Sequence, residues 1–171
     1  MTKKALIAMS GGVDSSVAAY LTRQTGYDCA GATMQLASCT LNEAADARAV
    51  AEKMQMPHYV FDFTENFRTA VMDKFAAGYA QGHTPNPCID CNRRLKFDQL
   101  LQSAKKLGYD YIATGHYARI EYDAASQRWL LKKALDATKD QSYVLFCLTQ
   151  NQLAHTLLPL GGLTKAEVRQ I

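Results

Sequence analysis

The sequence predicts an α/β fold built on a doubly wound, open parallel sheet of about five strands. Short apolar runs of the kind found in buried parallel strands alternate along the chain with segments of helical periodicity. Two of these runs end directly at glycine-containing turns, Ser10-Gly11-Gly12 and Gly115-His116. Ligands of such folds bind at the carboxyl ends of the strands, so both turns are candidate site segments.

The composition predicts one globular domain spanning residues 1–171. The chain is 48% hydrophobic and 20% charged, which are ordinary values for a soluble protein. Its apolar runs are far shorter than the ~20 residues of a membrane span, and its first residues do not resemble a signal peptide. We therefore expect a cytoplasmic protein without a membrane partner.

The charge is unevenly distributed along the chain. Residues 1–85 carry 7 basic and 8 acidic side chains, whereas residues 86–171 carry 12 and 8. The second half is therefore the better candidate for contact with a polyanion, although a surplus of this size is also typical of ordinary solvated surface.

In the first half, strands and helices are expected to alternate. The run Ala5–Met9 stops at a Ser-Gly-Gly turn, and apolar side chains four apart, from Phe67 to Tyr79, indicate a long helix. In chain order we expect a strand at 5–9, a helix from Asp14 or Ser15 to Gln24, a strand at 29–34, a helix at 43–54, a strand at 58–61 and a helix at 65–79.

In the second half, Gly82–Cys88 contains two prolines and a glycine, which predicts an irregular, shaped loop. Thr164 to Glu167 forms a capping-box sequence, and the chain ends soon after it, so we expect a fragment of a longer protein. The remaining expected elements are a helix at 92–107, a strand at 111–114 that completes a main sheet within about residues 1–117, and a hairpin at 118–122 and 129–133 that begins an appendage of residues 118–171.

The first glycine turn has the features of a phosphate site. A strand, two glycines and a helix start bring backbone N–H groups and the helix dipole around one anion-sized space. The lysine of the motif Gly-x-x-x-x-Gly-Lys-Ser/Thr is absent here. A plain strand-to-helix turn is the alternative, but it would explain the glycines and not the polar side chains of Ser10, Asp14, Ser15 and Ser16.

The segment Ser10-Gly11-Gly12-Val13-Asp14-Ser15-Ser16 resembles the pyrophosphatase loop of the N-type ATP pyrophosphatases, which have a HUP fold. The resemblance implies that the loop grips the pyrophosphate of ATP, that ATP is cleaved between its α- and β-phosphates, and that Asp14 helps to bind Mg²⁺. Donors and a cation at the leaving group suit this chemistry because charge develops there.

Three further motifs resemble the tRNA-specific 2-thiouridylases, and the likeness covers essentially the whole chain. The motifs are Thr84 to Asn92 followed by Lys96-Phe97, then Ala113 to Arg119, then Lys139 to Tyr143. By this resemblance, the enzyme adenylates the C2 oxygen of the wobble uridine of tRNA and replaces that oxygen with sulfur from a cysteine persulfide. Its implied partners are tRNA and a persulfide donor, such as a cysteine desulfurase or a sulfur relay protein.

By the same resemblance, Cys91 is the first catalytic cysteine and Asn86, Pro87 and Cys88 contact the target base. We expect Cys91 at the start of a helix near Asn92, where the dipole and the basic residues that follow would favour a thiolate. Many relatives have Asp in place of Cys88. The Cys88-x-x-Cys91 pair therefore also allows a redox pair, or two ligands of a metal or iron–sulfur cluster, which normally needs three or four.

The remaining site residues are also implied by the resemblance. Met34 is expected at the adenine, Gly115 beside the nucleotide and His116 near the substrate, although a core methionine and a structural histidine are the ordinary alternatives. Lys139, Asp140 and Gln141 are expected to contact tRNA, or else to form a polar turn. The residues expected at the nucleotide are Ala8, Met9, Ser10, Gly11, Gly12, Val13, Asp14, Ser15, Ser16, Met34 and Gly115, and those with catalytic roles are Asp14, Cys88, Cys91 and His116.

The other cysteines and the chain length leave questions open. Cys29 and Cys147 lie in apolar runs and are expected in the core, whereas the place of Cys39 stays open. The resemblance implies a second catalytic cysteine and later tRNA-binding and β-barrel domains, which would follow Ile171. We therefore expect either an isolated N-terminal domain or a shorter protein that uses another thiol. Two other functions therefore remain as alternatives: a non-catalytic module that binds ATP or tRNA, and an enzyme that adenylates another acceptor.

Overall fold

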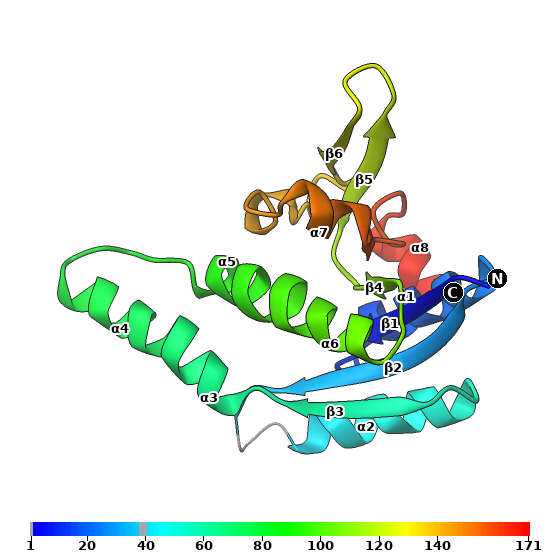
Figure 1. Cartoon of the computed structure of the whole chain (residues 1–171), viewed down its shortest axis with the longest axis horizontal. Coiled ribbons are helices and arrows are strands. Elements are labelled where there is room, and N and C mark those ends of the chain that lie inside the picture. The colour runs from blue at the N-terminus through cyan, green and yellow to red at the C-terminus, as the bar shows by residue number, and fades with distance from the viewer. Residues whose placement is uncertain (1, 38–40) are drawn as a thin grey trace.

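The computed structural model describes residues 2–37 and 41–171, so Cys39 lies outside the described residues. Its main sheet has five parallel strands in the order β3-β2-β1-β4-β7 (Figure 1). The predicted α/β fold with an open parallel sheet is confirmed. The strands are β1 (Lys4–Ala8), β2 (Asp28–Gln35), β3 (His58–Asp62), β4 (Tyr111–Ala113) and β7 (Thr156–Leu157).

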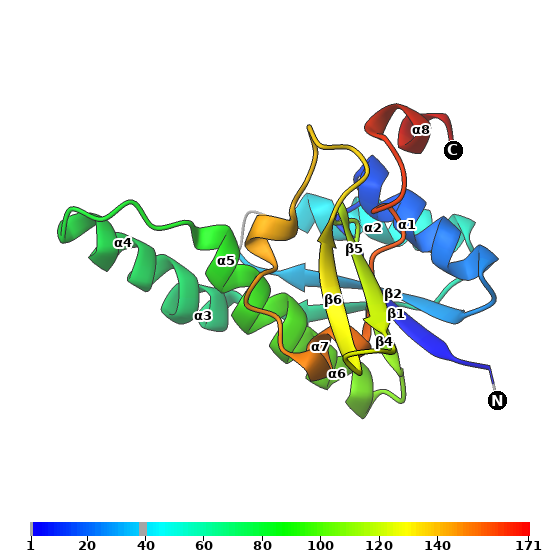
Figure 2. The ribbon, with the colours of Figure 1, turned by 90° about the horizontal axis from the view of Figure 1, so that it is seen from above.

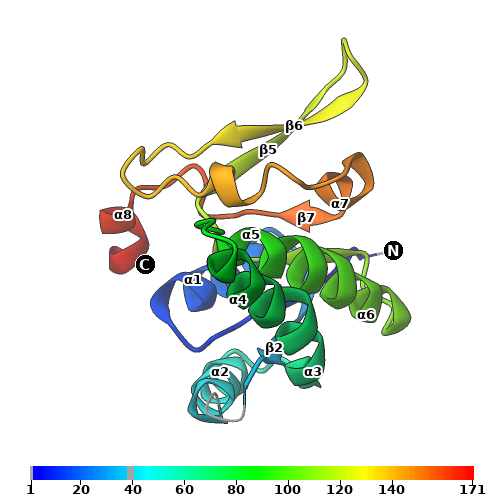
Figure 3. The same cartoon turned by 90° about the vertical axis from the view of Figure 1, so that its left-hand side faces the viewer.

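Helices cover both faces of the sheet. Successive side chains of β1 point to opposite faces, so they pack against different helices. Ala5 and Ile7 belong to a buried cluster with α1 and α2, whereas Leu6 belongs to a larger cluster with the helices that follow β3. Figure 3 shows α1 and α2 on one side of the sheet and the helices that follow β3 on the other. The helical segments that precede β4 are α1 (Val13–Gln24), α2 (Leu41–Lys53), α3 (Thr64–Phe67), η2 (Arg68–Met72), α4 (Asp73–Ala80), α5 (Pro87–Cys91), η3 (Asn92–Gln99) and α6 (Leu100–Lys106).

The helix expected at 92–107 begins earlier, at Pro87, which corrects the prediction of an irregular loop through Cys88. Asn86 is the N-cap, and its Oδ1 accepts a hydrogen bond of 3.0 Å from the Cys88 N–H. Proline fits the first turn of a helix because its missing N–H would have no intrahelical partner there. The following segments α5, η3 and α6 succeed one another without a break, and η3 has π-helical bonding.

The rod formed by α3, η2 and α4 projects away from the sheet, and residues 81–86 lead back to α5 (Figures 1 and 2). Lys74 Nζ lies 2.6 Å from Asp90 Oδ1, which ties α4 to α5. A Cβ on Gly78 would stand 3.0 Å from the ring of Pro85, so glycine permits the close return of the chain. These contacts position the segment that carries Cys88 and Cys91.

The predicted hairpin is confirmed as β5 (Ala118–Asp123) and β6 (Arg128–Lys133). After η4 (Ser142–Val144) and α7 (Gln150–Ala154) the chain returns to the main sheet as β7, which pairs with β4, so the sheet is not complete at residue 117. The capping box at Thr164 and Glu167 begins α8 (Lys165–Gln170), as expected. Among the described residues, no helix combines the length and the apolar character that crossing a membrane requires.

The fold makes a direct prediction about the larger core. Leu100 is fully buried, whereas Leu107 is 44% exposed at the end of the same helix. Leu100→Ala should lower the free energy of unfolding by about 2–5 kcal/mol, because it leaves a cavity in the core. Leu107→Ala should change it by about 0.5 kcal/mol or less. Urea unfolding of both variants measures the difference, and equal effects would contradict the described packing.

Candidate active site

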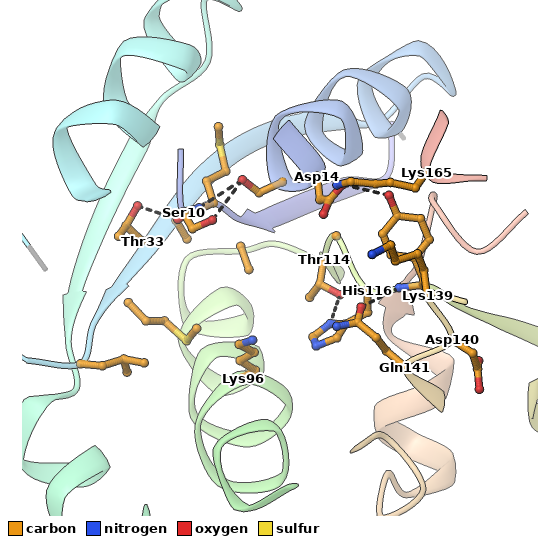
Figure 4. A pocket seen from close by; sticks show the side chains of 18 of the residues that line it. Ser10, Asp14, Thr33, Lys96, Thr114, His116, Lys139, Asp140, Gln141 and Lys165 are labelled. Carbon is orange, nitrogen blue, oxygen red and sulfur yellow. Dashed lines mark hydrogen bonds and ion pairs between the residues drawn. The ribbon is translucent and has the colours of Figure 1, made fainter. Parts of the chain in front are cut away.

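A cavity of about 600 Å³ lies at the carboxyl ends of β1, β2 and β4 (Figure 4). This volume is that of an ordinary site for a small molecule or cofactor. Gly11, Gly12, Val13 and Ser16 complete the first loop without lining the cavity. The residues predicted from the sequence that line it are Ala8, Met9, Ser10, Asp14, Ser15, Met34, Gly115, His116, Lys139, Asp140 and Gln141.

The loop after β1 is held in shape by its own serines. The Ser10 N–H donates to Ser15 Oγ at 3.2 Å, and the hydroxyls of Ser15 and Ser16 both donate to the Gly12 carbonyl, at 3.0 and 2.9 Å. No described side chain caps α1, whose N-cap is Gly12. Helix starts of this kind present N–H groups and the positive end of the dipole to an anion.

Gly11 is required at its position for two reasons. Its φ of +78° lies in the left-handed region, which L side chains rarely adopt. A Cβ there would stand 2.4 Å from the Cβ of Asp46 and 2.9 Å from the backbone nitrogen of Ala47, both in α2. The loop therefore packs directly on α2 as it turns from β1 into α1.

Met9 contributes to the site through its backbone. Its N–H donates to the Ala32 carbonyl at 2.8 Å, and its carbonyl accepts a hydrogen bond of 2.9 Å from Thr33 Oγ1. The Met9 side chain is only 3% exposed and belongs to the core under α1 and α2. Met34, in contrast, is half-buried, lines the cavity and packs against the larger core.

Asp14 has two partners from distant parts of the chain. Its Oδ1 accepts a hydrogen bond of 2.9 Å from the Tyr117 hydroxyl and lies 2.5 Å from Lys165 Nζ (Figure 4). Burial and the Asp14 carboxylate raise the pKa of Tyr117, which therefore remains a hydrogen-bond donor. Sequence reasoning missed both partners, because Lys165 follows Asp14 by 151 residues and stood out only as part of a capping box.

His116 is buried at the end of β4, with its Nδ1 2.8 Å from Thr114 Oγ1. Burial, with a smaller contribution from the charge of Lys96, lowers the pKa of His116 to about 3. The imidazole is therefore neutral at physiological pH. It can exchange hydrogen bonds with a ligand, but it carries no charge to attract a phosphate.

The three residues expected to contact tRNA have different environments. Asp140 accepts hydrogen bonds from the Ala134 N–H and the Ser142 hydroxyl, both at 2.8 Å, while Gln141 Oε1 accepts one of 3.0 Å from the Tyr117 N–H. These two side chains hold the wall of the cavity. Lys139 is exposed at its rim, where its charge is accessible to a ligand.

Asn86, Pro87, Cys88 and Cys91 do not line this cavity, but Cys91 has an electrostatic link to it. Lys96 lines the cavity from η3, and its charge acts on both Cys91 and His116. Cys91 is half-buried and packs against the larger core, whereas Cys88 is exposed in the first turn of α5. Lys96 thus connects the region of the two cysteines with the region of the glycine loop.

The expectation of a thiolate favoured at a helix start is wrong for Cys91. The helix begins at Pro87, so Cys91 lies one turn inside it. Burial raises the pKa of the Cys91 thiol, and the charge of Lys96 offsets this only in part. Of the cysteines expected in the core, Cys29 is buried as predicted, and Cys147 is half-buried.

Of the described residues, Asp14 and Asp140 are the carboxylates that line the cavity. Residues 2–37 and 41–171 contain no group of three or more His, Cys, Asp or Glu side chains placed to hold a metal ion. Mg²⁺ commonly takes one or two carboxylates and completes its shell with phosphate and water. Asp14 beside the glycine loop suits that arrangement. Cys88 and Cys91 would need further ligands to hold a cluster.

Comparison with known proteins finds a matching family model and similar curated proteins. A family model described as "tRNA methyl transferase HUP domain" matches residues 3–171. The tRNA-specific 2-thiouridylase MnmA of Clostridioides difficile is 51% identical over 182 residues, covering 100% of this chain and 50% of the relative. That of Moorella thermoacetica is 52% identical over 178 residues, covering 97% and 50%. The chain thus spans about half the length of the curated relatives it matches.

Two solved structures share the fold at low sequence identity. A predicted subunit of tRNA methyltransferase from Methanocaldococcus jannaschii has a TM-score of 0.57 and 15% identity, over 98% of this chain and 73% of that one. A glutamine-dependent NAD+ synthetase from Acinetobacter baumannii has a TM-score of 0.60 and 14% identity, over 98% of this chain and 28% of that one. Both support the predicted HUP-type architecture.

The packing of Gly11 predicts a stability defect with a matched control. Gly11→Ala should lower the free energy of unfolding by about 1–3 kcal/mol or more, because the new methyl group adds a clash with α2 to the strained backbone. Gly26 also has a positive φ, of +88°, but open space around it. Gly26→Ala should therefore cost about 1–2 kcal/mol, from the backbone alone. A smaller loss for Gly11→Ala than for Gly26→Ala in urea unfolding would contradict this packing.

The environment of Cys91 predicts a pH profile. In a Cys88→Ser background, alkylation of Cys91 by iodoacetamide should rise with pH to a midpoint above the ordinary thiol pKa, because burial disfavours the thiolate. Lys96→Gln should move the midpoint still higher, whereas Lys132→Gln, on the remote hairpin, should not. Peptide mass mapping at each pH gives both midpoints. A fall of the midpoint in the Lys96 variant would refute the assigned influence of Lys96.

Proposed function

This chain belongs to the family of tRNA methyl transferase HUP domains, and on that premise we propose that it is the ATP-using part of an enzyme that thiolates tRNA. The carrying observation is that one cavity at the carboxyl edge of the sheet brings the Ser10–Ser16 loop together with Met34, His116 and Lys96. The relatives named tRNA-specific 2-thiouridylase suggest the acceptor, C2 of a tRNA uridine, and the resemblance of the sequence motifs implies the wobble position.

In the proposed reaction, ATP binds with its β- and γ-phosphates at the Ser10–Ser16 loop, its adenine near Met34, and Gly115 beside the nucleotide. Support comes from the serine-braced loop, the side chain of Met34 in the cavity wall, and the close approach of Gly115 to the loop: a Cβ on Gly115 would stand 3.0 Å from the Asp14 carbonyl carbon. Mg²⁺, held through Asp14 and the phosphates, would supply charge neutralisation for the leaving pyrophosphate.

The uridine C2 oxygen would then attack the α-phosphorus, and the bond to pyrophosphate would break. Fixed donors of the loop stabilise the charge that develops on the leaving group, which is the largest contribution that this chain's own residues can make. Neutral His116 would orient the base by a hydrogen bond. Lys139, exposed at the rim, would contact a tRNA phosphate, and Asn86, Pro87 and Cys88 would approach the target base.

Sulfur transfer completes the proposed function. The terminal sulfur of a persulfide attacks C2 of the adenylated uridine, the bond from C2 to the adenylate oxygen breaks, and AMP leaves with that oxygen. A second thiol then attacks the inner sulfur, the S–S bond breaks, and 2-thiouridine is released. The disulfide formed between the two thiol sulfurs is reduced by an external thiol. We assign Cys91 to this stage, with Cys88 beside it, and a cysteine desulfurase or a sulfur relay protein as the donor. Cys91 is partly shielded from solvent, which protects a reactive sulfur. Burial raises the pKa of its thiol, and the charge of Lys96 reverses part of that rise. The enzyme would act in the cytoplasm.

The test separates adenylation from sulfur transfer. With ATP, Mg²⁺ and a tRNA that has an unmodified wobble uridine, the chain should release pyrophosphate, and Cys91→Ala should retain that release, because the cysteine acts after adenylation. With a desulfurase and cysteine added, Cys91→Ala should form about 100-fold less 2-thiouridine than the parent, as expected for loss of a covalent participant. Cys147→Ser is the matched control.

Each of three outcomes would contradict one part of the proposed function. Undiminished 2-thiouridine from Cys91→Ala would remove Cys91 from the mechanism. Absence of pyrophosphate release at any protein concentration, with ATP still bound, would identify a binding module in place of an enzyme. Pyrophosphate release that does not depend on tRNA but follows another added acceptor would replace the proposed substrate.

A further inference from the structure

We propose that Lys165 is a phosphate-binding residue, which pairs with Asp14 in the free protein and transfers its hydrogen bond to the β- or γ-phosphate of bound ATP. The inference rests on the proposed nucleotide site and adds a residue to it from the far end of the chain. The Ser10–Ser16 loop itself contains no lysine. Lys165, although distant in sequence, would supply to the phosphates the positive charge that the loop lacks.

The position of Lys165 supports direct contact with a ligand. Its Nζ lies 2.5 Å from Asp14 Oδ1, in the first turn of α1, where the proposed phosphate site begins. The Lys165 side chain lines the cavity and is 22% exposed, so its ammonium group is shielded but accessible from the cavity. The Nζ also lies 5.9 Å from the centroid of the Tyr117 ring, which adds a favourable contact for the cation.

The backbone of Lys165 is fixed from several sides. Its N–H donates to Asp136 Oδ2 at 3.0 Å, and the capping box of Thr164 and Glu167 closes the first turn of α8. Val168, one turn further, is fully buried in a cluster with α1. The anchor point is therefore held against α1 while the four-carbon stem of the lysine remains free to rotate.

The charges of Mg²⁺ and of the phosphates explain why Lys165 would exchange Asp14 for a phosphate oxygen. In the free protein, Lys165 neutralises an Asp14 carboxylate that also accepts a hydrogen bond from Tyr117. With a magnesium nucleotide bound, Asp14 would help to hold Mg²⁺, and the phosphates would offer Lys165 more negative charge than one carboxylate. A short rotation of the stem then brings the ammonium group to a phosphate oxygen. Asp14 keeps its bond to Tyr117, so the carboxylate stays oriented.

Calorimetric titration with two probes tests the proposal. Magnesium ATP carries the β- and γ-phosphates, and AMP lacks them. Lys165→Met should weaken binding of magnesium ATP by about tenfold or more, the loss expected for a charge-assisted hydrogen bond, and should leave binding of AMP unchanged. Lys165→Arg, which retains the charge, should lose less. Lys106→Met, an exposed lysine at the end of α6, is the control, and thermal unfolding verifies that each variant is folded.

A second substitution distinguishes a phosphate ligand from a support for Asp14. In an Asp14→Asn background, Lys165→Met should weaken binding of magnesium ATP further, because Lys165 contacts the phosphate itself. A Lys165 effect that disappears in this background, or Lys165→Met binding equal to that of the parent, would overturn the proposal. Failure of the parent chain to bind magnesium ATP would instead overturn the proposed function, and this inference with it.

Discussion

The parallel pairing of β1 with β2 on one side and β4 on the other is the constraint on which the rest of the site depends. Because these strands run in the same direction, the loop at Ser10, the residues after Ala32 and the turn at Gly115 all meet at one edge of the sheet. Two hydrogen bonds of the Met9 backbone, with the Ala32 carbonyl and the Thr33 hydroxyl, fix the start of the glycine loop at that edge. The loop then packs on α2, where only a glycine at position 11 fits.

Charge is distributed around this edge by segments that are distant in sequence. Lys96 comes from η3, Lys139 from the stretch after the hairpin and Lys165 from α8, and all three line one cavity with the Asp14 carboxylate. His116 remains neutral because it is buried beside Lys96. In the proposed function these roles are separate: the lysine ammonium groups would contact phosphate, and the neutral imidazole would contact the base. This division is what an enzyme that handles a nucleotide and a nucleic acid together would need.

The sequence was sufficient for the features set by local pattern. The strands around Ile7, Ala32 and Ile112, the hairpin and the capping box at Thr164 follow from apolar runs and cap residues, and the structure has them. It was insufficient where tertiary contacts decide. β7 has only two residues and forms because β4 offers a free edge, and the start of α5 at Pro87 depends on a cap by Asn86. Lys165 and Tyr117 meet Asp14 only after the whole sheet is assembled, so no local pattern could predict them.

The central claim is that ATP binds at the carboxyl edge of the sheet with its phosphates on the glycine loop. Amide chemical shifts of the ¹⁵N-labelled chain, followed during titration with Mg²⁺ and α,β-methylene-ATP, test it most directly. The account predicts the largest changes at Ser10–Ser16, with further changes at Met34 and Gly115. Changes gathered instead at the second cavity, at the opposite edge near Lys4, Asp110 and His155, or no changes at all, would contradict it.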